Sequence, residues 1–182
     1  MERVTLHDKT FRIYVPNEEI EKNIQAVADR LNRDLADAEH PVFLCVLKGS
    51  FMFFASLMQK LTIQPEIEFV RLASYCGTQT SGEVKQIMGL TGDLRGKTVV
   101  IVEDIVDTGN TIVKLHELVK KQDAAAIHTC TLVMKPEVYD KELKIDYCAM
   151  DIENRFIVGY GLDYDQLGRE LKDIYILDEE NN

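Results

Sequence analysis

The sequence feature that most constrains the fold is the stretch from Val99 to Thr111, which reads VVIVEDIVDTGNT. Its first four residues are apolar and β-branched, which is typical of a strand buried on both faces. Two acidic residues, Glu103 and Asp104, follow this run, and a short polar loop then precedes a helical pattern. A strand that ends in carboxylates, followed by a small-residue loop that opens a helix, indicates a ligand site at the carboxyl edge of a parallel sheet.

Strand and helix patterns alternate along the first two-thirds of the chain, which predicts βαβ units and the α/β class. Apolar or extended runs predict strands at 41–47, 66–72, 84–90, 99–102, 126–134, 145–150, 156–161 and 174–177. Apolar residues at helical spacing predict helices over about 18–38, 51–60 and 111–121. In the last helix His116 lies off the apolar face, and we expect it to be solvated. A chain of 182 residues fits one domain, a mostly parallel twisted sheet flanked by helices.

Two predicted helices begin at residues that suit a helix N-terminus, Asn17 and Ser50. Before Ser50, Lys48 and Gly49 separate a buried strand from the helix. A lone lysine at a strand end is usually a surface residue. Here, however, its charge and the N–H groups of the helix start would converge on one spot, which suits an anion. Position alone leaves both interpretations open.

The segment from Ala73 to Glu83 is small and polar and contains two glycines. It is too long for a tight hairpin, and long loops of this kind in compact domains are often lids over a site. The alternative is a disordered surface loop.

The polar loop from Asp107 to Thr111 has the residue types of a phosphate site. Neither the G-x-G-x-x-G nor the G-x-x-x-x-G-K-[ST] signature occurs, which removes the main support for Rossmann and P-loop folds. Gly109 would let the backbone approach a ligand, while Thr108 and the helix N-terminus would supply donors. These features fit a phosphate monoester. In the alternative, Asp107 or Thr108 only caps the helix, which leaves the preceding acidic pair unexplained.

The acidic pair Glu103-Asp104 suggests what lies beside that phosphate. Adjacent carboxylates on a strand point to opposite sides of the backbone, and they could accept hydrogen bonds from two ribose hydroxyls or help hold a hydrated Mg²⁺. A ribose 5-phosphate is therefore the economical ligand. Asp107 would then lie near the reacting carbon of the sugar, where it could act as a general acid or base.

Charge and composition exclude several classes of protein. The net charge is −10 without a basic tract, which argues against a nucleic-acid surface, and no apolar run is long enough to span a membrane. The four cysteines are far apart and form no C-x-x-C pair, so we expect reduced thiols. The N-terminus has no signal-peptide pattern, and we expect a cytoplasmic protein. An anionic ligand would need local lysine or arginine, backbone N–H groups or a bridging metal.

With these residues in view, the chain resembles the type I phosphoribosyltransferases and, more narrowly, the hypoxanthine-guanine phosphoribosyltransferase family. Val99–Thr111 is similar to their phosphoribosyl pyrophosphate motif, and the match covers most of the chain. The other matching segments are Leu47-Lys48-Gly49 (pyrophosphate loop), Arg71–Tyr75 (start of the mobile loop), Val133-Met134-Lys135 (purine-reading lysine), Phe156–Tyr164 (purine stacking and metal) and Arg169.

The resemblance implies a fold and an activity. The fold would be one domain over residues 1–182, with a hood formed by the N- and C-terminal segments and a mobile loop at about 73–86. The activity would be purine salvage, in which Mg²⁺-dependent transfer from phosphoribosyl pyrophosphate to N9 of hypoxanthine or guanine gives IMP or GMP plus pyrophosphate. A homodimer or homotetramer is expected, without nucleic-acid or membrane partners.

The resemblance also implies the residues that hold phosphoribosyl pyrophosphate. The Leu47–Lys48 peptide would often be cis, Glu103 and Asp104 would contact the ribose hydroxyls and help bind the metal, and a closing loop would exclude water from an oxocarbenium-like transition state. The residues expected to bind the phosphoribosyl and pyrophosphate groups are Lys48, Gly49, Ser74, Tyr75, Glu103, Asp104, Asp107, Thr108, Gly109, Asn110, Thr111 and Arg169. Asn110 departs from relatives that carry lysine or arginine there, so we expect altered phosphate affinity.

A second implied set reads the purine. Asp107 would take the proton from purine N7, and Lys135 would donate to the 6-oxo group. Phe156 would stack on the base, and the carbonyl of Ile157 would accept from it. Asp163 lies in the purine segment and would bind a Mg²⁺ that also holds pyrophosphate.

Two other functions remain to be weighed against this one. A nucleotide-sensing regulator that binds RNA could keep the same fold, but the lack of a basic stripe counts against it. A receiver-like signalling domain would gather its acids at the end of the first strand, whereas the acidic pair here comes much later in the chain.

Overall fold

The computed structural model describes residues 3–74, 84–88, 90 and 92–179. Its helices are α1 (Asn17–Asp34), α2 (Phe51–Lys60) and α3 (Asn110–Lys120). A large sheet contains β3 (Val42–Leu47), β4 (Glu66–Ser74), β5 (Val84–Met88), β6 (Thr98–Val106), β7 (Ala126–Met134) and β8 (Tyr147–Asp151). A small sheet contains β1 (Arg3–Leu6), β2 (Lys9–Val15), β9 (Ile157–Val158) and β10 (Ile174–Leu177).

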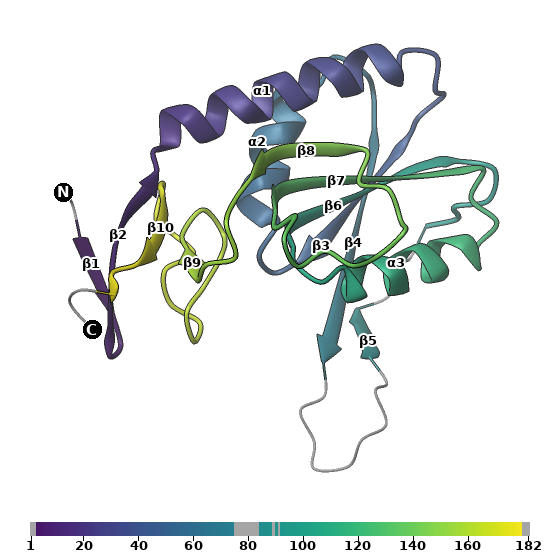
Figure 1. Cartoon of the computed structure of the whole chain (residues 1–182). Coiled ribbons are helices and arrows are strands. Elements are labelled where there is room, and N and C mark those ends of the chain that lie inside the picture. The colour runs from purple at the N-terminus through teal and green to yellow at the C-terminus, as the bar shows by residue number, and fades with distance from the viewer. Residues whose placement is uncertain (1–2, 75–83, 89, 91, 180–182) are drawn as a thin grey trace.

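The large sheet has the strand order β5-β4-β3-β6-β7-β8, in which β4, β3, β6, β7 and β8 run parallel and β5 is antiparallel to β4. Helices α1 and α2 cover one face and α3 covers the other (Figure 1). The predicted α/β fold with a mostly parallel sheet is confirmed. None of the helices in the described part of the chain is both long and apolar enough to cross a membrane.

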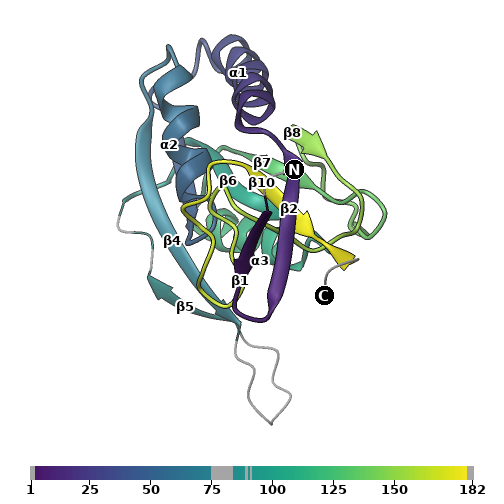
Figure 2. The same cartoon turned by 90° about the vertical axis from the view of Figure 1, so that its left-hand side faces the viewer.

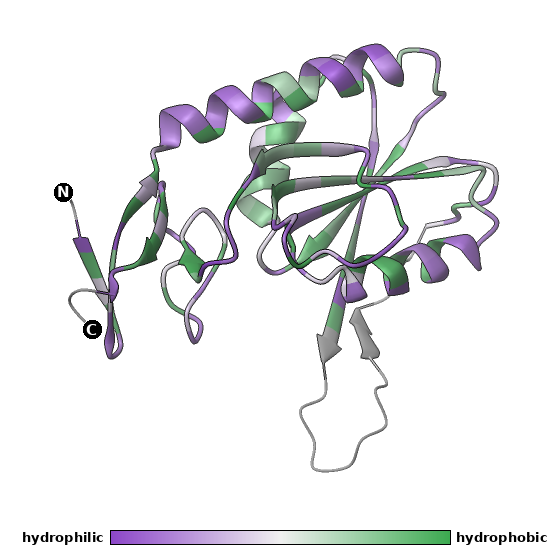
Figure 3. Cartoon of the chain, in the orientation of Figure 1, coloured by the Kyte–Doolittle hydropathy of each residue, from purple (hydrophilic) through white to green (hydrophobic). Residues whose placement is uncertain are grey.

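Strand β6 lies in the middle of this sheet, and its side chains build both halves of the core. Val100 and Val102 belong to the apolar cluster under α1 and α2, whereas Val99 and Ile101 belong to the cluster under α3. This alternation is the period of two expected of a strand between two helical layers. Figure 3 shows the apolar residues gathered in the strands and on the inner sides of the helices.

The small sheet joins the two ends of the described chain. The β1–β2 hairpin pairs with β10, and β10 pairs with the short strand β9. Figure 2 shows this sheet from its own side, with α1 leading from β2 towards the large sheet. Its separate core contains Leu6, Phe11, Val158 and Tyr175.

Several expected boundaries differ from the structure, and three of them bear on the site. Strand β6 continues to Val106 because its end still pairs with β7, so Glu103 and Asp104 lie within the strand. The extended segment predicted at 156–161 is a strand only at β9. The segment 84–90 is β5 as far as Met88, and the expected mobile loop falls largely on residues 75–83, outside the described residues.

The expected caps of two helices are also corrected. Helix α1 spans Asn17–Asp34 and has Pro16 at its N-cap. The side-chain amide of Asn17 donates to the Lys172 carbonyl (2.9 Å), and its backbone N–H donates to Asp173 Oδ1 (2.7 Å). Ser50 does occupy the N-cap of α2, but its hydroxyl donates to the Val46 carbonyl (2.6 Å) and makes no cap hydrogen bond. Both side chains therefore serve contacts outside their own helix.

The environment of His116 also differs from the expectation. Its side chain is half-buried between α3 and β7, and Nε2 lies 2.8 Å from the Thr129 hydroxyl. Burial lowers the pKa of this imidazole. The prediction of a solvated histidine is wrong because the sheet extends beneath that side of α3.

Candidate active site

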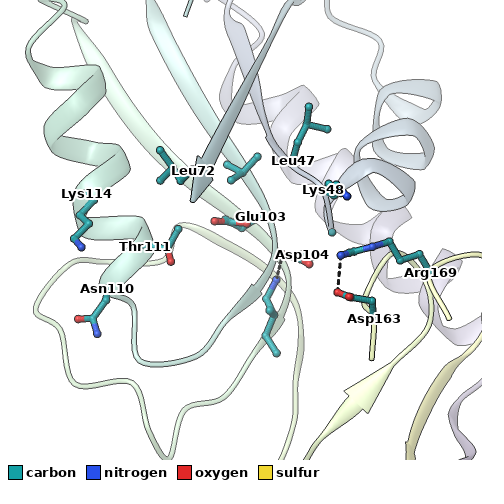
Figure 4. Close-up of a pocket in the computed structure, with 13 residues that line it drawn as sticks. Leu47, Lys48, Leu72, Glu103, Asp104, Asn110, Thr111, Lys114, Asp163 and Arg169 are labelled. Carbon is teal, nitrogen blue, oxygen red and sulfur yellow. Dashed lines mark hydrogen bonds and ion pairs between the residues drawn. The ribbon is translucent and has the colours of Figure 1, made fainter. Parts of the chain in front are cut away.

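A cavity of about 440 Å³ opens at the carboxyl ends of β3 and β6, beside the start of α3 (Figure 4). It collects side chains and backbone from segments that are far apart in the sequence. The predicted site residues that line it are Lys48, Gly49, Glu103, Asp104, Asn110, Thr111, Asp163 and Arg169.

The turn between β3 and α2 forms one wall of this cavity. The Leu47–Lys48 peptide bond is cis. A Cβ at Gly49 would lie 1.5 Å from Asp104 Oδ2, so only glycine leaves room for that carboxylate. The Lys48 ammonium donates to Gln166 Oε1 at 3.1 Å, which ties this turn to the C-terminal part of the chain.

The two adjacent acids of β6 lie at the floor of the cavity. Glu103 is buried (5% exposed), and burial raises the pKa of its carboxyl well above the ordinary value, with Asp104 raising it further. Burial also raises the pKa of Asp104. Strand geometry predicts that neighbouring side chains point apart, yet both line this cavity because it lies across the end of the sheet. Such a buried pair would interact strongly with hydroxyl donors or a cation.

The loop from Asp107 to Thr111 leads directly into α3. Gly109 is the N-cap residue with φ of 82°, a left-handed conformation that favours glycine, and a Cβ there would lie 2.5 Å from the Tyr139 ring. Helix α3 has no side-chain cap hydrogen bond, so the alternative in which Asp107 or Thr108 only caps the helix is wrong. The N–H groups of the first turn of α3 therefore remain available to an anion beside Asn110 and Thr111.

Asp107 faces the lysine at the end of β7. Lys135 Nζ lies 3.6 Å from Asp107 Oδ2 and 3.5 Å from Asn154 Oδ1. The Lys135 side chain is 10% exposed, whereas that of Asp107 is half exposed. A nearly buried ammonium needs such partners. Because the carboxylate is more accessible than the ammonium, it can reach a ligand while the lysine keeps it in place.

The C-terminal segment closes the other side of the cavity. Arg169 donates to Asp163 Oδ1 (2.6 Å) and to the Gly161 carbonyl (2.8 Å), and Figure 4 shows this ion pair opposite α3. Gly161 has φ of 99°, and a Cβ there would lie 2.0 Å from the Gly49 carbonyl oxygen. The backbone of this segment therefore packs directly against the β3–α2 turn.

The predicted purine-stacking residue lies at the junction of the two sheets. Phe156 is 46% exposed, and its ring meets Tyr164 edge to face (5.7 Å between centroids) and lies 6.1 Å from Phe11. Ile157 is buried in β9, where it pairs with β10. An exposed aromatic ring held by two others is a suitable stacking surface.

The comparison with protein families decides the identity of the fold. The model of the phosphoribosyl transferase domain matches residues 12–165. The chain belongs to the phosphoribosyltransferase family. It is accordingly a transferase enzyme.

Curated relatives place this phosphoribosyltransferase more narrowly, in the hypoxanthine-guanine group. The chain is 36% identical over 170 residues to the hypoxanthine-guanine phosphoribosyltransferase of Streptococcus thermophilus (93% of this chain, 94% of the relative). It is 34% identical over 175 residues to the hypoxanthine phosphoribosyltransferase of Escherichia coli (93% and 98%). A solved hypoxanthine phosphoribosyl transferase of Trypanosoma cruzi superposes with a TM-score of 0.87 at 35% identity, covering 97% of this chain and 96% of that one.

Some residues of this phosphoribosyltransferase site were missed from the sequence. Lys114 also lines the cavity, and its spacing of four from Asn110 on a helix was a signal that could have revealed it. Gln166 and Asn154, the partners of Lys48 and Lys135, carried no sequence signal because their contacts come from separate segments. Ser74 ends β4, its side chain is outside the described part, and Tyr75 lies outside it altogether.

Proposed function

We propose that this phosphoribosyltransferase acts in purine salvage and transfers the 5-phosphoribosyl group from phosphoribosyl pyrophosphate to N9 of hypoxanthine or guanine. The products would be IMP or GMP and pyrophosphate. The names of the relatives support this choice of purines. The observation that carries it is the Asp107–Lys135 pair beside the loop of Asp107–Thr111, which we call the phosphate cradle, because the pair combines a proton acceptor with a donor suited to a 6-oxopurine.

The phosphoribosyl group would lie along the cavity. The 5-phosphate would accept from the first turn of α3 and from the loop of Asp107–Thr111 (Asp107, Thr108, Gly109, Asn110 and Thr111). The ribose hydroxyls would donate to Glu103 and Asp104. Lys48, Gly49 and Arg169 would bind pyrophosphate at the opposite wall, with Ser74 and Tyr75 covering it.

The purine would lie between Phe156 and Lys135, with the Ile157 carbonyl accepting from its edge. N9 forms a bond to C1 of the ribose as the C1–O bond to pyrophosphate breaks and pyrophosphate leaves with the electron pair. Asp107 takes the proton from N7. The small sheet of the N- and C-terminal segments would serve as the hood over the base, within one domain.

The carboxylates of the cavity fit a Mg²⁺ ion. Mg²⁺ prefers oxygen ligands and is usually bound through one or two carboxylates together with substrate phosphates and water. Asp163 and the pair Glu103-Asp104 supply such oxygens at the two sides of one cavity. Bound there, the ion would neutralise the leaving pyrophosphate. Among the described residues no group of three or more Asp, Glu, His or Cys forms a metal cluster.

The proposal is tested by spectrophotometric assays of hypoxanthine, guanine and xanthine with phosphoribosyl pyrophosphate, each with and without Mg²⁺. We expect Mg²⁺-dependent formation of IMP or GMP, and much slower formation in a D107N control. Absence of transfer to every purine would overturn the proposal. An RNA gel shift at physiological salt tests the regulator alternative, which the net charge of −10 disfavours.

A further inference from the structure

The phosphate cradle, the loop from Asp107 to Thr111, contains no positively charged side chain. From Asp107 to Thr111 the only charged side chain is the carboxylate of Asp107, and residue 110 is a neutral asparagine. A phosphate monoester carries between one and two negative charges near neutral pH. The N–H groups of a helix start bring only about half a charge. A dianion in this cradle therefore calls for a cation from another position.

Three cationic side chains line the described cavity: Lys48, Lys114 and Arg169. Lys48 donates to Gln166, and Arg169 is bound to Asp163. Figure 4 shows both of them on the wall opposite α3. They are placed for the pyrophosphate end of the substrate. The stem of Lys141 also packs near Gly109, but its ammonium pairs with Asp140 and it does not line the cavity. The lining cation on the α3 side is therefore Lys114.

Helix geometry brings Lys114 over the cradle. Residues four apart on a helix lie on the same face, so Lys114 lies one turn after Asn110 on the same side of α3. Helical side chains also lean towards the N-terminus, so the lysine stem carries its ammonium back over the first turn. Figure 4 shows Lys114 with its nitrogen directed towards the end of the helix where Asn110 and Thr111 lie.

We propose that Lys114 supplies the positive charge that binds the 5-phosphate, in place of a cation at residue 110. The inference rests on the proposed function and deepens it by naming a residue that determines the affinity for the 5-phosphate. The N–H groups of α3 orient the phosphate oxygens, and the ammonium one turn later neutralises them. The group recognised is a terminal phosphate monoester on a ribose.

The test compares two ligands that differ only in that phosphate. Calorimetry gives Kd for IMP and for inosine with the full-length parent and with Lys114→Gln, which removes the charge but keeps a good helix former. We expect Kd for IMP to rise about 5- to 20-fold, because the lost interaction should be worth more than an exposed ion pair and less than a charge-assisted hydrogen bond. Kd for inosine should stay unchanged. Lys120→Gln makes the same charge change in the last turn of α3 and should leave both constants unchanged.

A rescue variant makes the result independent of folding. Moving the charge by one turn, in Asn110→Lys combined with Lys114→Gln, should restore most of the affinity for IMP. Equal Kd for IMP in the parent and in Lys114→Gln would overturn the inference, and so would equal losses for IMP and inosine. A parent enzyme that neither binds IMP nor transfers to any purine would instead overturn the proposed function.

Discussion

Asp107 and Lys135 hold opposite charges 3.6 Å apart, at the point where the phosphate cradle meets the end of β7. The lysine is nearly buried and the carboxylate half exposed. The pair would therefore keep the carboxylate oriented while leaving it free to reach a proton on the purine. The two residues have separable roles in the proposed mechanism.

The role of Asp107 predicts a specific loss of rate. Asp107→Asn keeps the size of the side chain but cannot take a proton. We therefore expect kcat to fall about 10²- to 10⁴-fold, which is the usual contribution of a general acid or base to the rate. Single-turnover measurements are needed because slow product release can hide the chemical step. A near-parental single-turnover rate would show that Asp107 is not the base.

The role of Lys135 predicts a loss in purine binding. Lys135→Ala removes a charge-assisted donor worth about 1.5–3 kcal/mol, so KM for the purine should rise on the order of 10- to 100-fold. The Kd of phosphoribosyl pyrophosphate, measured without purine, should change little. If that Kd alone changed, the assignment of Lys135 to the base would be wrong.

Two backbone turns meet behind the cavity. The β3–α2 turn and the segment after β9 touch at Gly49 and Gly161, and Arg169 binds the Gly161 carbonyl from its other side. This contact sets the distance between the pyrophosphate loop and Asp163. The geometry of the cavity therefore depends on two glycines.

Substitution at this contact should disturb both fold and site. Gly161→Ala places a Cβ 2.0 Å from the Gly49 carbonyl at a φ of 99°. We expect a loss of about 2–5 kcal/mol of unfolding free energy and weaker binding of phosphoribosyl pyrophosphate. Urea unfolding and calorimetry measure the two effects.

Gly96→Ala is the matched control for that variant. Gly96 also has a positive φ (72°), but a Cβ there has nothing within 4 Å. It should lose only the conformational cost of about 1–2 kcal/mol, with unchanged ligand binding. Equal effects of the two variants would show that the close approach at Gly49 is unimportant.

The half-buried His116 predicts that the folded protein is less stable in acid. Burial lowers the pKa of this imidazole in the folded state. The charge of Asp146 raises the pKa and so opposes this shift, whereas His128 lowers the pKa further. Between the folded pKa and the ordinary value of 6.5, the unfolded state binds more protons, so stability falls as the pH drops through this window.

The expected measurement is urea unfolding at about pH 7.5 and about pH 5. His116→Gln retains a side chain that can bond to Thr129 but cannot be protonated. It should lose less stability than the parent on acidification. An identical loss in both proteins would show that His116 does not contribute to the pH dependence.

The oligomeric state stays a prediction. Phe51, Ile67 and Phe69 are large apolar side chains of α2 and β4 that are 44%, 52% and 38% exposed. We expect a homodimer or homotetramer that buries them, since exposed apolar patches often mark protein interfaces. Phe69→Glu should lower the mass measured by light scattering, whereas Leu167→Glu, at an exposed apolar site elsewhere, should not. A monomeric parent would contradict this expectation.

Local patterns predicted the elements well. The bounds of α2, β7 and β10 agree with the expected ranges, because each is a run of apolar residues with a clear period and a clear stop. Prediction was weaker where a distant partner decides the outcome. The backbone N–H of Asn17 donates to Asp173, and Asn17 does not cap α1. Strand β6 continues to Val106 because β7 pairs with it.

Local patterns alone predict the strand, the glycine loop and the helix start of Val99–Thr111, and with them the family resemblance, because the period of the side chains and the backbone conformation of Gly109 are local properties. Which other residues join this stretch depends on tertiary packing. The packing of the β3–α2 turn against β6 and the C-terminal segment brings Gly49 against Asp104, Gly161 against Gly49, and Gln166 to Lys48. No local pattern encodes these contacts, because they depend on packing between segments that are distant along the chain.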